Sequence, residues 1–358
     1  MKARAFWSSS VYAALGAAAL FGASTPFAKV LLKGTSPVLL AGLLYLGSGI
    51  GLGLVRLLRD RGWRIPSLSR PEWGWLVLAI GLGGVLGPLL LMFGLATTPA
   101  STASLLLNLE AVLTAVIAWV VFRESTDRNV MLGMLVIVTG AALLTWPDMR
   151  QSTGGWSWGS LFIACACLCW ALDNNFTRKV SASDALFLAG LKGMVAGVVN
   201  TGMALVLGAR LPGAVAMGGA MIVGLLGYGV SLVLFVLALR GLGTARTGAY
   251  FSTAPFIGAA IAILIFGEQV TGVFWVVFVL MAVGVWLHLT ERHEHMHTHE
   301  AIIHTHRHVH DEHHHHSHDF PWDGREPHTH EHTHAPITHN HPHYPDIHHR
   351  HRHSDHGN

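Results

Sequence analysis

Charged and amide side chains interrupt two long apolar stretches in the middle of the chain. Asp173, Asn174 and Asn175 lie near the end of the first stretch, and Lys192 lies inside the second. An ionisable group in a strongly apolar segment is costly unless it is paired or hydrated, so these residues predict a functional site. We expect Asp173 and Lys192 to form a buried ion pair that holds a polar solute or exchanges a proton. The alternative is a static ion pair that only locks the two segments together. Such a pair would not need the additional hydrogen-bonding groups of Asn174 and Asn175, so their presence favours a functional role.

Three further polar residues extend this candidate site. Glu110, with Asn108 near it, is a carboxylate deep in an apolar segment of the first half of the chain. A carboxylate in a semi-dry cavity suits proton coupling, and the alternative role is a partner for Lys192 or for a helix end. Asn200 follows Lys192 by eight positions, so it lies on nearly the same face of a helix. This alignment predicts a polar track across the segment.

Aromatic and hydroxyl residues supply the remaining candidates. Tyr250 and Ser252 precede Pro255, which frees a backbone carbonyl one turn earlier in a helix. They predict either a polar wall of a cavity or a kink that serves only packing. We expect Trp170 either to pack at a membrane interface or to face the same cavity as Asp173.

The tail, residues 291–358, differs from the rest of the chain because histidines are interspersed throughout it. No hydrophobic periodicity supports a fold there, so we expect a disordered segment. Neutral imidazole suits Zn, Ni, Co and Cu, which predicts reversible, unselective metal binding; the alternative is a polar extension with incidental affinity. The predicted ligands are His293, His295, His297, His299, His304, His306, His308, His310, His313, His314, His315 and His316. No cofactor is expected elsewhere.

The composition places the chain among membrane proteins. It is 51% hydrophobic and 12% charged, whereas a soluble domain carries about 25% charged residues. A net charge of +3 is too small to indicate a nucleic-acid partner. A bilayer-spanning helix needs about 20 mostly apolar residues. The windows that qualify are 10–32, 38–58, 73–95, 101–122, 129–147, 157–177, 185–208, 217–239, 247–266 and 270–290.

The distribution of Lys and Arg predicts the orientation in the membrane. If the N-terminus is inside, most basic residues fall in inside loops, as the positive-inside rule requires. The outside loops then hold only Lys29, Lys33, Arg150 and Arg210. We therefore expect both termini in the cytoplasm, an inner-membrane location in a bacterium, and a retained first helix instead of a signal peptide. The expected partners are the lipid bilayer, a small solute and, through the tail, divalent metal ions, with a homodimer left open.

The chain contains a weak internal repeat. Phe122 and Glu124 recur 144 residues later as Phe266 and Glu268, in segments whose apolar patterns also match. Each half, 8–147 and 156–290, contains five windows, and an odd number forces the halves into opposite orientations. The expected fold is an all-α polytopic membrane protein with ten transmembrane helices in two inverted five-helix repeats. Glu124 and Glu268 stand at helix ends, where we expect a structural role.

Short motifs in both halves of the chain carry a resemblance to a known family: Phe21-Gly22-Ala23-Ser24-Thr25-Pro26-Phe27, Asn108-Leu109-Glu110-Ala111, Phe122-Arg123-Glu124, Trp170-Ala171, Thr253-Ala254-Pro255-Phe256 and Gly267-Glu268. With these motifs the chain resembles the EamA-type members of the drug/metabolite transporter superfamily. The resemblance implies a ten-helix inverted-repeat carrier that works by alternating access around a central cavity. Ala111 departs from this pattern, because the family usually has a proline here that matches Pro255, so the kink that such a proline would produce is not expected in the first half.

A secondary transporter of a small polar solute or metabolite is therefore the leading hypothesis. The chain has no nucleotide-binding signature, and no nucleophile–base pair indicates an enzyme. One alternative is a transporter of divalent Ni, Co or Zn, and another is a carrier gated by a metal-sensing tail. Against metal cargo, the chain has no His before His288, and its only cysteines are Cys165, Cys167 and Cys169 in one segment.

Overall fold

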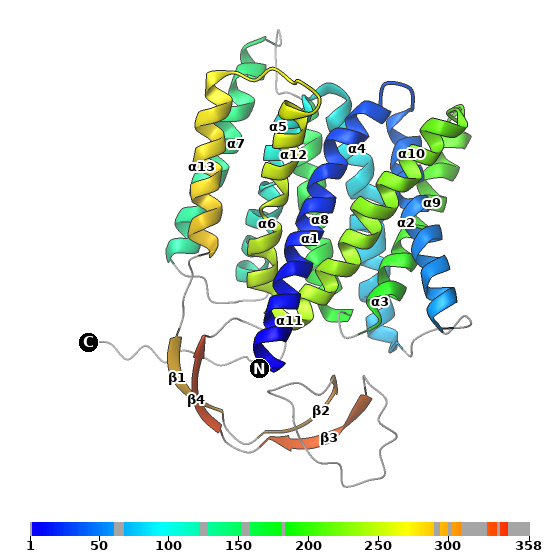
Figure 1. Cartoon of the computed structure of the whole chain (residues 1–358). Coiled ribbons are helices and arrows are strands. Elements are labelled where there is room, and N and C mark those ends of the chain that lie inside the picture. The colour runs from blue at the N-terminus through cyan, green and yellow to red at the C-terminus, as the bar shows by residue number, and fades with distance from the viewer. Residues whose placement is uncertain are drawn as a thin grey trace.

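A bundle of long helices forms the body of the protein in the computed structural model (Figure 1). Among the described residues, eight helices are long and apolar enough to cross a membrane, and two shorter apolar helices accompany them. These segments match the ten expected windows and make an all-α polytopic membrane protein. The described residues are 2–60, 68–121, 128–151, 158–180, 183–289, 294–299, 302–308, 328–334 and 337–342.

Helical segments follow one another from the N-terminus almost to the tail. The first half contains α1 (Lys2–Leu31), α2 (Pro37–Asp60), α3 (Arg70–Ala79), η1 (Ile80–Leu86), α4 (Gly87–Thr97), α5 (Ala100–Leu106), α6 (Leu109–Val120) and α7 (Arg128–Gln151). The second half contains α8 (Trp158–Val180), α9 (Ala185–Val206), α10 (Ala214–Gly224), η2 (Leu225–Val230), α11 (Ser231–Phe251), α12 (Ala254–Leu264) and α13 (Gly272–Leu289). Helix α11 runs across the boundary expected between the eighth and ninth windows.

Two π-helical segments occupy matching places in the two halves. Gly83 lies in η1, and Gly227, which follows it by 144 residues (227 − 83), lies in η2. A π-helical turn widens the helix and shifts its hydrogen bonds, and such segments often occur at functional sites. The structure therefore repeats the same local distortion at the spacing of the sequence repeat.

The helix breaks also match. Helix α5 ends before Leu107 and α6 begins after Asn108, while α11 ends before Ser252 and α12 begins after Thr253. The first break forms although Ala111 replaces the proline of the family, so a break occurs where none was expected. The Asn108 side chain explains part of it, because its Nδ2 donates to the Leu105 carbonyl at 3.1 Å and caps the end of α5.

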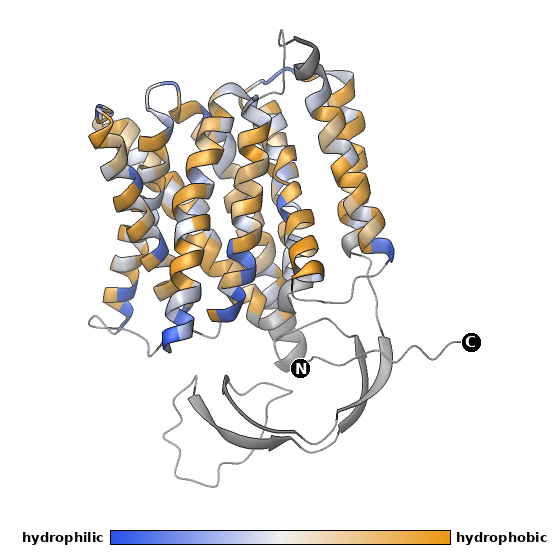
Figure 2. Cartoon of the chain, turned by 180° about the vertical axis from the view of Figure 1, so that it is seen from behind, coloured by the Kyte–Doolittle hydropathy of each residue, from blue (hydrophilic) through white to orange (hydrophobic). Residues whose placement is uncertain are grey.

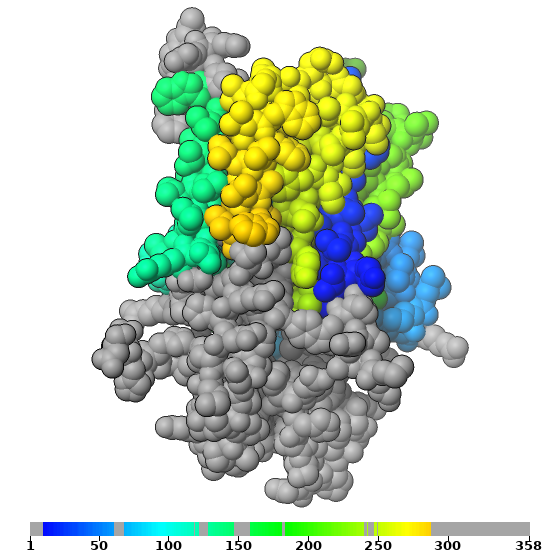
Figure 3. Space-filling view, turned by 60° about the vertical axis from the view of Figure 1, so that its left-hand side comes forward, coloured from blue at the N-terminus to red at the C-terminus, as the bar shows by residue number. Residues whose placement is uncertain are grey.

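Contacts between the halves follow the same symmetry. Helix α2 packs along α9, and α7 packs along α13, so these pairs join equivalent helices of the two halves. Helix α1 packs on α11 and α12 of the second half, and its counterpart α8 packs in the same way on α4 and α6 of the first half. Figure 3 shows α13 lying against α7, with α1 beside α12. This pattern brings residues of both halves around one centre.

Helices α2 and α9 are tied together at one end by charge. Asp184 precedes α9 and accepts a hydrogen bond from the Phe187 N–H at 3.0 Å, and it pairs with the Arg59 guanidinium at the end of α2. Burial alone would raise the pKa of Asp184, but the Arg59 guanidinium and the Phe187 N–H hold that pKa below its usual range. The pair makes α2 and α9 a fixed support beside the candidate site.

Glycine at the crossing of α10 and α2 gives a testable consequence of this packing. A Cβ added at Gly224 would overlap the backbone of Leu44, whereas a Cβ at Gly218 of the same helix would meet open space. We expect Gly224→Ala to lower the melting temperature in detergent by several degrees because two backbones must separate. Gly218→Ala is the matched control and should melt like the wild type. Equal melting temperatures for the two variants would contradict the close packing.

The outer surface of the bundle is apolar, as contact with lipid requires. Large exposed hydrophobic residues include Val206, Val215 and Leu264. Many hydrophilic residues lie at the end of the bundle where α1 begins (Figure 2). Helix α13 ends at that same end (Figure 1). The cytoplasmic location of this end stays a prediction.

Four short strands occur in the tail, which we expected to be disordered throughout. They are β1 (Glu294–His299), β2 (Ile302–His308), β3 (His328–His334) and β4 (Ile337–Pro342). Strand β1 pairs with β4, and β2 pairs with β3, both antiparallel. Alternation of His with Thr and Ile suits a strand in these stretches, and disorder in the rest of the tail stays a prediction. His293, His310 and His313 to His316 lie outside the described residues, as does Glu124.

Candidate functional site

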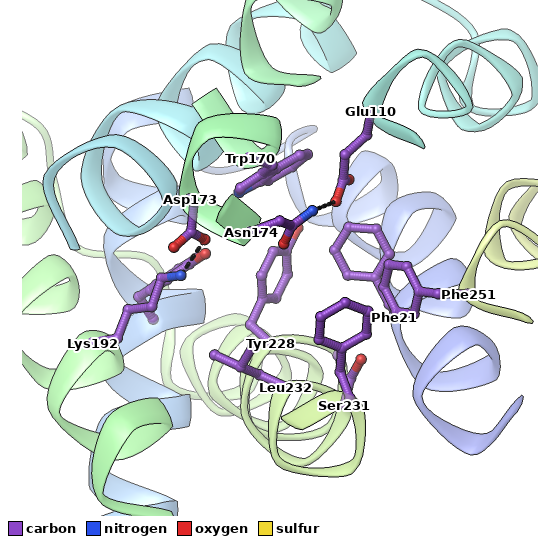
Figure 4. A pocket seen from close by; sticks show the side chains of 13 residues that line it. Phe21, Glu110, Trp170, Asp173, Asn174, Lys192, Tyr228, Ser231, Leu232 and Phe251 are labelled. Atoms are coloured by element: carbon purple, nitrogen blue, oxygen red, sulfur yellow. Dashed lines mark hydrogen bonds and ion pairs between the residues drawn. The ribbon is translucent and has the colours of Figure 1, made fainter. Parts of the chain in front are cut away.

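A cavity of about 60 Å³ lies inside the bundle. Such a volume holds on the order of four water molecules. Its lining comes from both halves of the chain (Figure 4): Phe21, Tyr45, Glu110, Trp170, Asp173, Asn174, Lys192, Gly227, Tyr228, Ser231, Leu232, Phe235 and Phe251. Five of the ten residues that we predicted for the site line this cavity: Glu110, Trp170, Asp173, Asn174 and Lys192.

An ion pair forms one wall of the cavity. Lys192 Nζ of α9 contacts Asp173 Oδ2 of α8, and both residues are about 5% exposed. Thr177, one turn further along α8, donates to Asp173 Oδ1 at 2.9 Å. Each carboxylate oxygen therefore has a partner, which is the condition under which a buried pair is tolerated.

A second carboxylate lies across the cavity from this pair. Asn174 Nδ2 donates to Glu110 Oε1 at 2.8 Å and lies 3.5 Å from Thr114 Oγ1. Because Asp173 and Asn174 are consecutive on α8, that helix places one polar group toward Lys192 and the next toward Glu110 (Figure 4). The site therefore contains two carboxylates and one ammonium group.

The π-helical segment η1 supplies backbone acceptors behind this wall. The Gly83 carbonyl accepts from Tyr45 Oη and from Trp170 Nε1, each at 3.0 Å. The Val85 carbonyl accepts from Asn200 Nδ2 at 3.2 Å. A π-helical turn leaves carbonyls available to side chains, so α2, α8 and α9 are all anchored to η1. Asn200 thus binds η1, and it does not line the cavity.

Aromatic rings complete the lining of the cavity. Phe21 lies at their centre, with ring centroids 5.8 Å from Trp170, 5.8 Å from Tyr228 and 5.3 Å from Phe251. Phe251 in turn contacts Phe235 at 4.9 Å. The cavity therefore combines two carboxylates, an ammonium group and an amide with the faces and edges of aromatic rings.

The Asp173–Lys192 ion pair has no charged counterpart at the related positions of the first half. Added Cβ atoms at Gly83 and Gly84 would meet Asp173 and Lys192, whereas those at Gly227 and Gly229 would meet Ser24 and Ser48. Ser48 precedes Lys192 by the repeat spacing of 144 residues, so a serine occupies the place in the first half that corresponds to the lysine of the ion pair. The helical fold therefore repeats in both halves, but the ion pair occurs in the second half alone.

The other predicted residues stabilise helices near the cavity. Asn175 Nδ2 donates to the Ala171 carbonyl at 2.8 Å, and Ser252 Oγ donates to the Gly248 carbonyl at 2.9 Å. Asn108 lies at the break between α5 and α6, and Tyr250 packs against a small apolar cluster around Ala14 and Leu242. None of these four side chains lines the described cavity.

Sequence reasoning missed most of the aromatic lining. Tyr45, Tyr228, Phe235 and Phe251 have the residue types of ordinary apolar packing. One signal was present: Gly227 and Tyr228 follow Gly83 and Gly84 by 144 residues. Applying the repeat spacing to the helix that carries Gly83 would have identified the segment that completes the cavity.

The membrane part offers little to a metal ion. Among the described residues, no group of three or more His, Cys, Asp or Glu residues could hold one. Cys167 is buried with its Sγ 3.7 Å from the Leu106 carbonyl, and all three cysteines are free thiols. The side chains of the tail histidines lie outside the described part of the structure.

An apolar helical bundle with a buried polar cavity between two matching halves defines a polytopic membrane transporter. The chain belongs to the EamA-like transporter family, whose model matches residues 8–146 and 157–290. This match confirms the resemblance seen in the sequence and is consistent with a protein that is not an enzyme.

Known relatives agree with this assignment. An uncharacterized transporter of Methanothermobacter thermautotrophicus is 28% identical over 281 residues, which cover 75% of this chain and 82% of that protein. A probable 4-amino-4-deoxy-L-arabinose-phosphoundecaprenol flippase subunit ArnE of Pseudomonas paraeruginosa is 39% identical over 90 residues, 25% of this chain and 73% of its own. One solved crystal structure shares the fold, with a TM-score of 0.60 at 15% identity, over 79% of this chain and 98% of its own.

Proposed function

We propose that this protein is a secondary active transporter that moves a small polar solute across the membrane by alternating access. The observation that carries the proposal is the cavity in which Asp173, Lys192, Glu110 and Asn174 face aromatic rings from both halves (Figure 4). Polar groups in such a segment are costly unless they meet each other, water or a solute. In this protein these polar groups line a single cavity, where a solute could meet all of them.

The cavity also indicates the chemistry of the solute. The Asp173–Lys192 pair offers both signs of charge, and Asn174 and Glu110 offer a further donor and acceptor. The rings around Phe21 accept the apolar part of a ligand or a cationic group over a ring face. A compact solute with both donor and acceptor groups fits this arrangement, and proton exchange at Glu110 supplies a means of coupling.

Transport in proteoliposomes tests the proposal. The full-length chain is reconstituted, and uptake of amino acids, amines, sugars and nucleosides is measured with and without a pH gradient and with and without Zn or Ni. An amine-bearing lipid is included because one relative is named as a probable flippase subunit. We expect a non-metal solute to accumulate when a pH gradient is imposed. Movement of Zn or Ni alone, with no organic solute transported, would contradict the proposal.

A metal-binding tail is the second candidate function, and the strand register favours it. His295 faces His341 and His297 faces His339 between β1 and β4. His304 faces His332, His306 faces His330 and His308 faces His328 between β2 and β3. Directly opposed residues of an antiparallel pair share one face of the sheet, about 5 Å apart at Cβ. Such positions suit two-histidine binding of Zn, Ni, Co or Cu.

Deletion of residues 291–358 separates the two candidates. If the tail only binds metal, the shortened protein should transport the non-metal solute at the wild-type rate while binding of Zn, measured by calorimetry, is lost. A transport rate that falls on deletion and depends on added metal would instead support a carrier gated by its tail. A shortened protein that still binds Zn as the full chain does would contradict metal binding by the tail.

A further inference from the structure

One carboxylate joins two turns at the end of the bundle where α4 meets α5. Glu268 Oε1 accepts from the Ala100 N–H at 2.8 Å, and Glu268 Oε2 accepts from the Ser101 N–H at 2.6 Å. Gly267 has a φ of +65°, a conformation that favours glycine and turns the chain after α12 toward α5. Hydrogen bonds to an ionised carboxylate are stronger than neutral ones. Glu268 therefore fixes the second half of the chain to the first.

Helix α1 is tied to the same place. Lys29 Nζ donates to the Leu95 carbonyl at 2.6 Å and to the Ala96 carbonyl at 3.2 Å, in the last turn of α4. The rings of Phe27 and Phe266 meet edge to face at 5.4 Å. Three elements, α1, the α4–α5 turn and the α12–α13 turn, thus converge at one end of the protein.

A buried layer separates this end from the cavity. The cavity residues Phe21, Glu110 and Trp170 each lie about one helical turn further from this end than the layer does. The layer consists of buried residues on α1, α5 and α8: Thr25, Ala28, Ser104, Leu105, Leu106, Ile163 and Ala166. The cavity is therefore closed toward the α4–α5 turn by close packing.

Within this layer, at Thr25 and Ser104, and next to it in sequence lie polar atoms that a permanent apolar seal would not need. Thr25 Oγ1, Thr98 Oγ1, Ser104 Oγ and Asn108 Oδ1 are buried and have no hydrogen-bond partner among the described residues. A buried polar group without a partner is costly, so each such group calls for a physical reason. An open state in which these groups meet water or a solute supplies that reason.

We propose that this layer is the closed half of the solute path, and that Glu268 with Lys29 forms the latch that keeps it shut. Thr25, Ser104 and Asn108 line the path when it opens. Opening requires the α4–α5 turn to leave the Glu268 carboxylate and the Lys29 ammonium group. Glu268 is a positioning residue in this scheme, and the inference rests on the proposed transport function.

Thiol labelling of the full-length chain tests the latch. In a background without Cys165, Cys167 and Cys169, Ser104→Cys is exposed to a membrane-impermeant thiosulfonate applied to each face of the membrane separately. Glu268→Gln replaces one carboxylate oxygen, an acceptor, with an NH2 group, which is a donor, and removes the negative charge. Glu268→Ala removes both acceptors. We expect labelling from the α5 end to accelerate by about tenfold in Glu268→Gln, the effect of losing a charge-assisted hydrogen bond, and further in Glu268→Ala. A cysteine at the exposed Gly34 identifies the membrane face of that end.

A second carboxylate provides the matched control. Glu72 Oε2 accepts from the Ser69 N–H at 2.7 Å, but this contact stays within the start of α3. Glu72→Gln should therefore leave labelling of Ser104→Cys unchanged. The latch is excluded if Glu268→Gln and Glu268→Ala elute as folded protein from size exclusion and label at the wild-type rate. Labelling needs no solute, so a failed transport screen with accelerated labelling would reject the proposed function and retain the latch.

Discussion

Lys192→Met should abolish transport and strongly destabilise the protein. The substitution leaves the Asp173 carboxylate buried, with the Thr177 hydroxyl as its one remaining side-chain partner among the described residues. Breaking one side of a buried ion pair costs about 3–5 kcal/mol, because the remaining charge is uncompensated. We expect a melting temperature in detergent well below that of the wild type. Lys33→Met, at an exposed lysine near the end of α1, is the control and should behave like the wild type.

The double variant Asp173→Asn/Lys192→Met distinguishes a functional pair from a static one. It removes both charges and leaves the introduced amide oxygen to accept from Thr177, so we expect the melting temperature to return toward the wild-type value. Transport should remain at least about 100-fold below wild type if the pair binds solute, which corresponds to about 2.7 kcal/mol. A folded double variant that transports at the wild-type rate would show that the pair only locks α8 to α9.

Glu110→Gln should uncouple transport from the pH gradient while leaving the fold intact. Glutamine keeps an oxygen that can accept from Asn174 Nδ2, the contact that Glu110 makes at 2.8 Å, but it cannot take up a proton. We expect accumulation driven by a pH gradient to fall at least about tenfold, since the coupling step has lost its titrating group. Exchange of labelled solute for unlabelled solute, which needs no net proton movement, should continue.

Two measurements make this prediction specific to coupling. Accumulation under a pH gradient and exchange without one are recorded on the same proteoliposomes. Asn174→Ala removes the neighbouring donor and should weaken exchange as well as accumulation, because Asn174 lines the cavity. Unchanged pH-driven accumulation in Glu110→Gln would assign proton coupling to another residue.

Much of the architecture followed from the sequence because a bilayer imposes simple requirements. Apolar windows of sufficient length predicted the helices, and the 144-residue repeat predicted matching halves, of which the two π-helical segments are an example. The polar cluster was predictable for the same reason: Asp173, Lys192 and Glu110 are conspicuous in apolar segments. Composition and spacing along the chain carry this information, so the helices and the polar cluster can be predicted without knowing which distant residues are in contact.

The sequence alone determined an all-helical membrane transporter with a polar centre. Only the tertiary structure decided which residues share the cavity, since Phe21, Tyr228 and Phe251 look like packing residues until helices from both halves meet. It also showed that Asn108, Asn175 and Asn200 do not line the cavity, because their amide nitrogens donate to backbone carbonyls instead. The physical reason is that hydropathy fixes how deeply a residue is buried, whereas helix crossings that glycine permits fix what it faces.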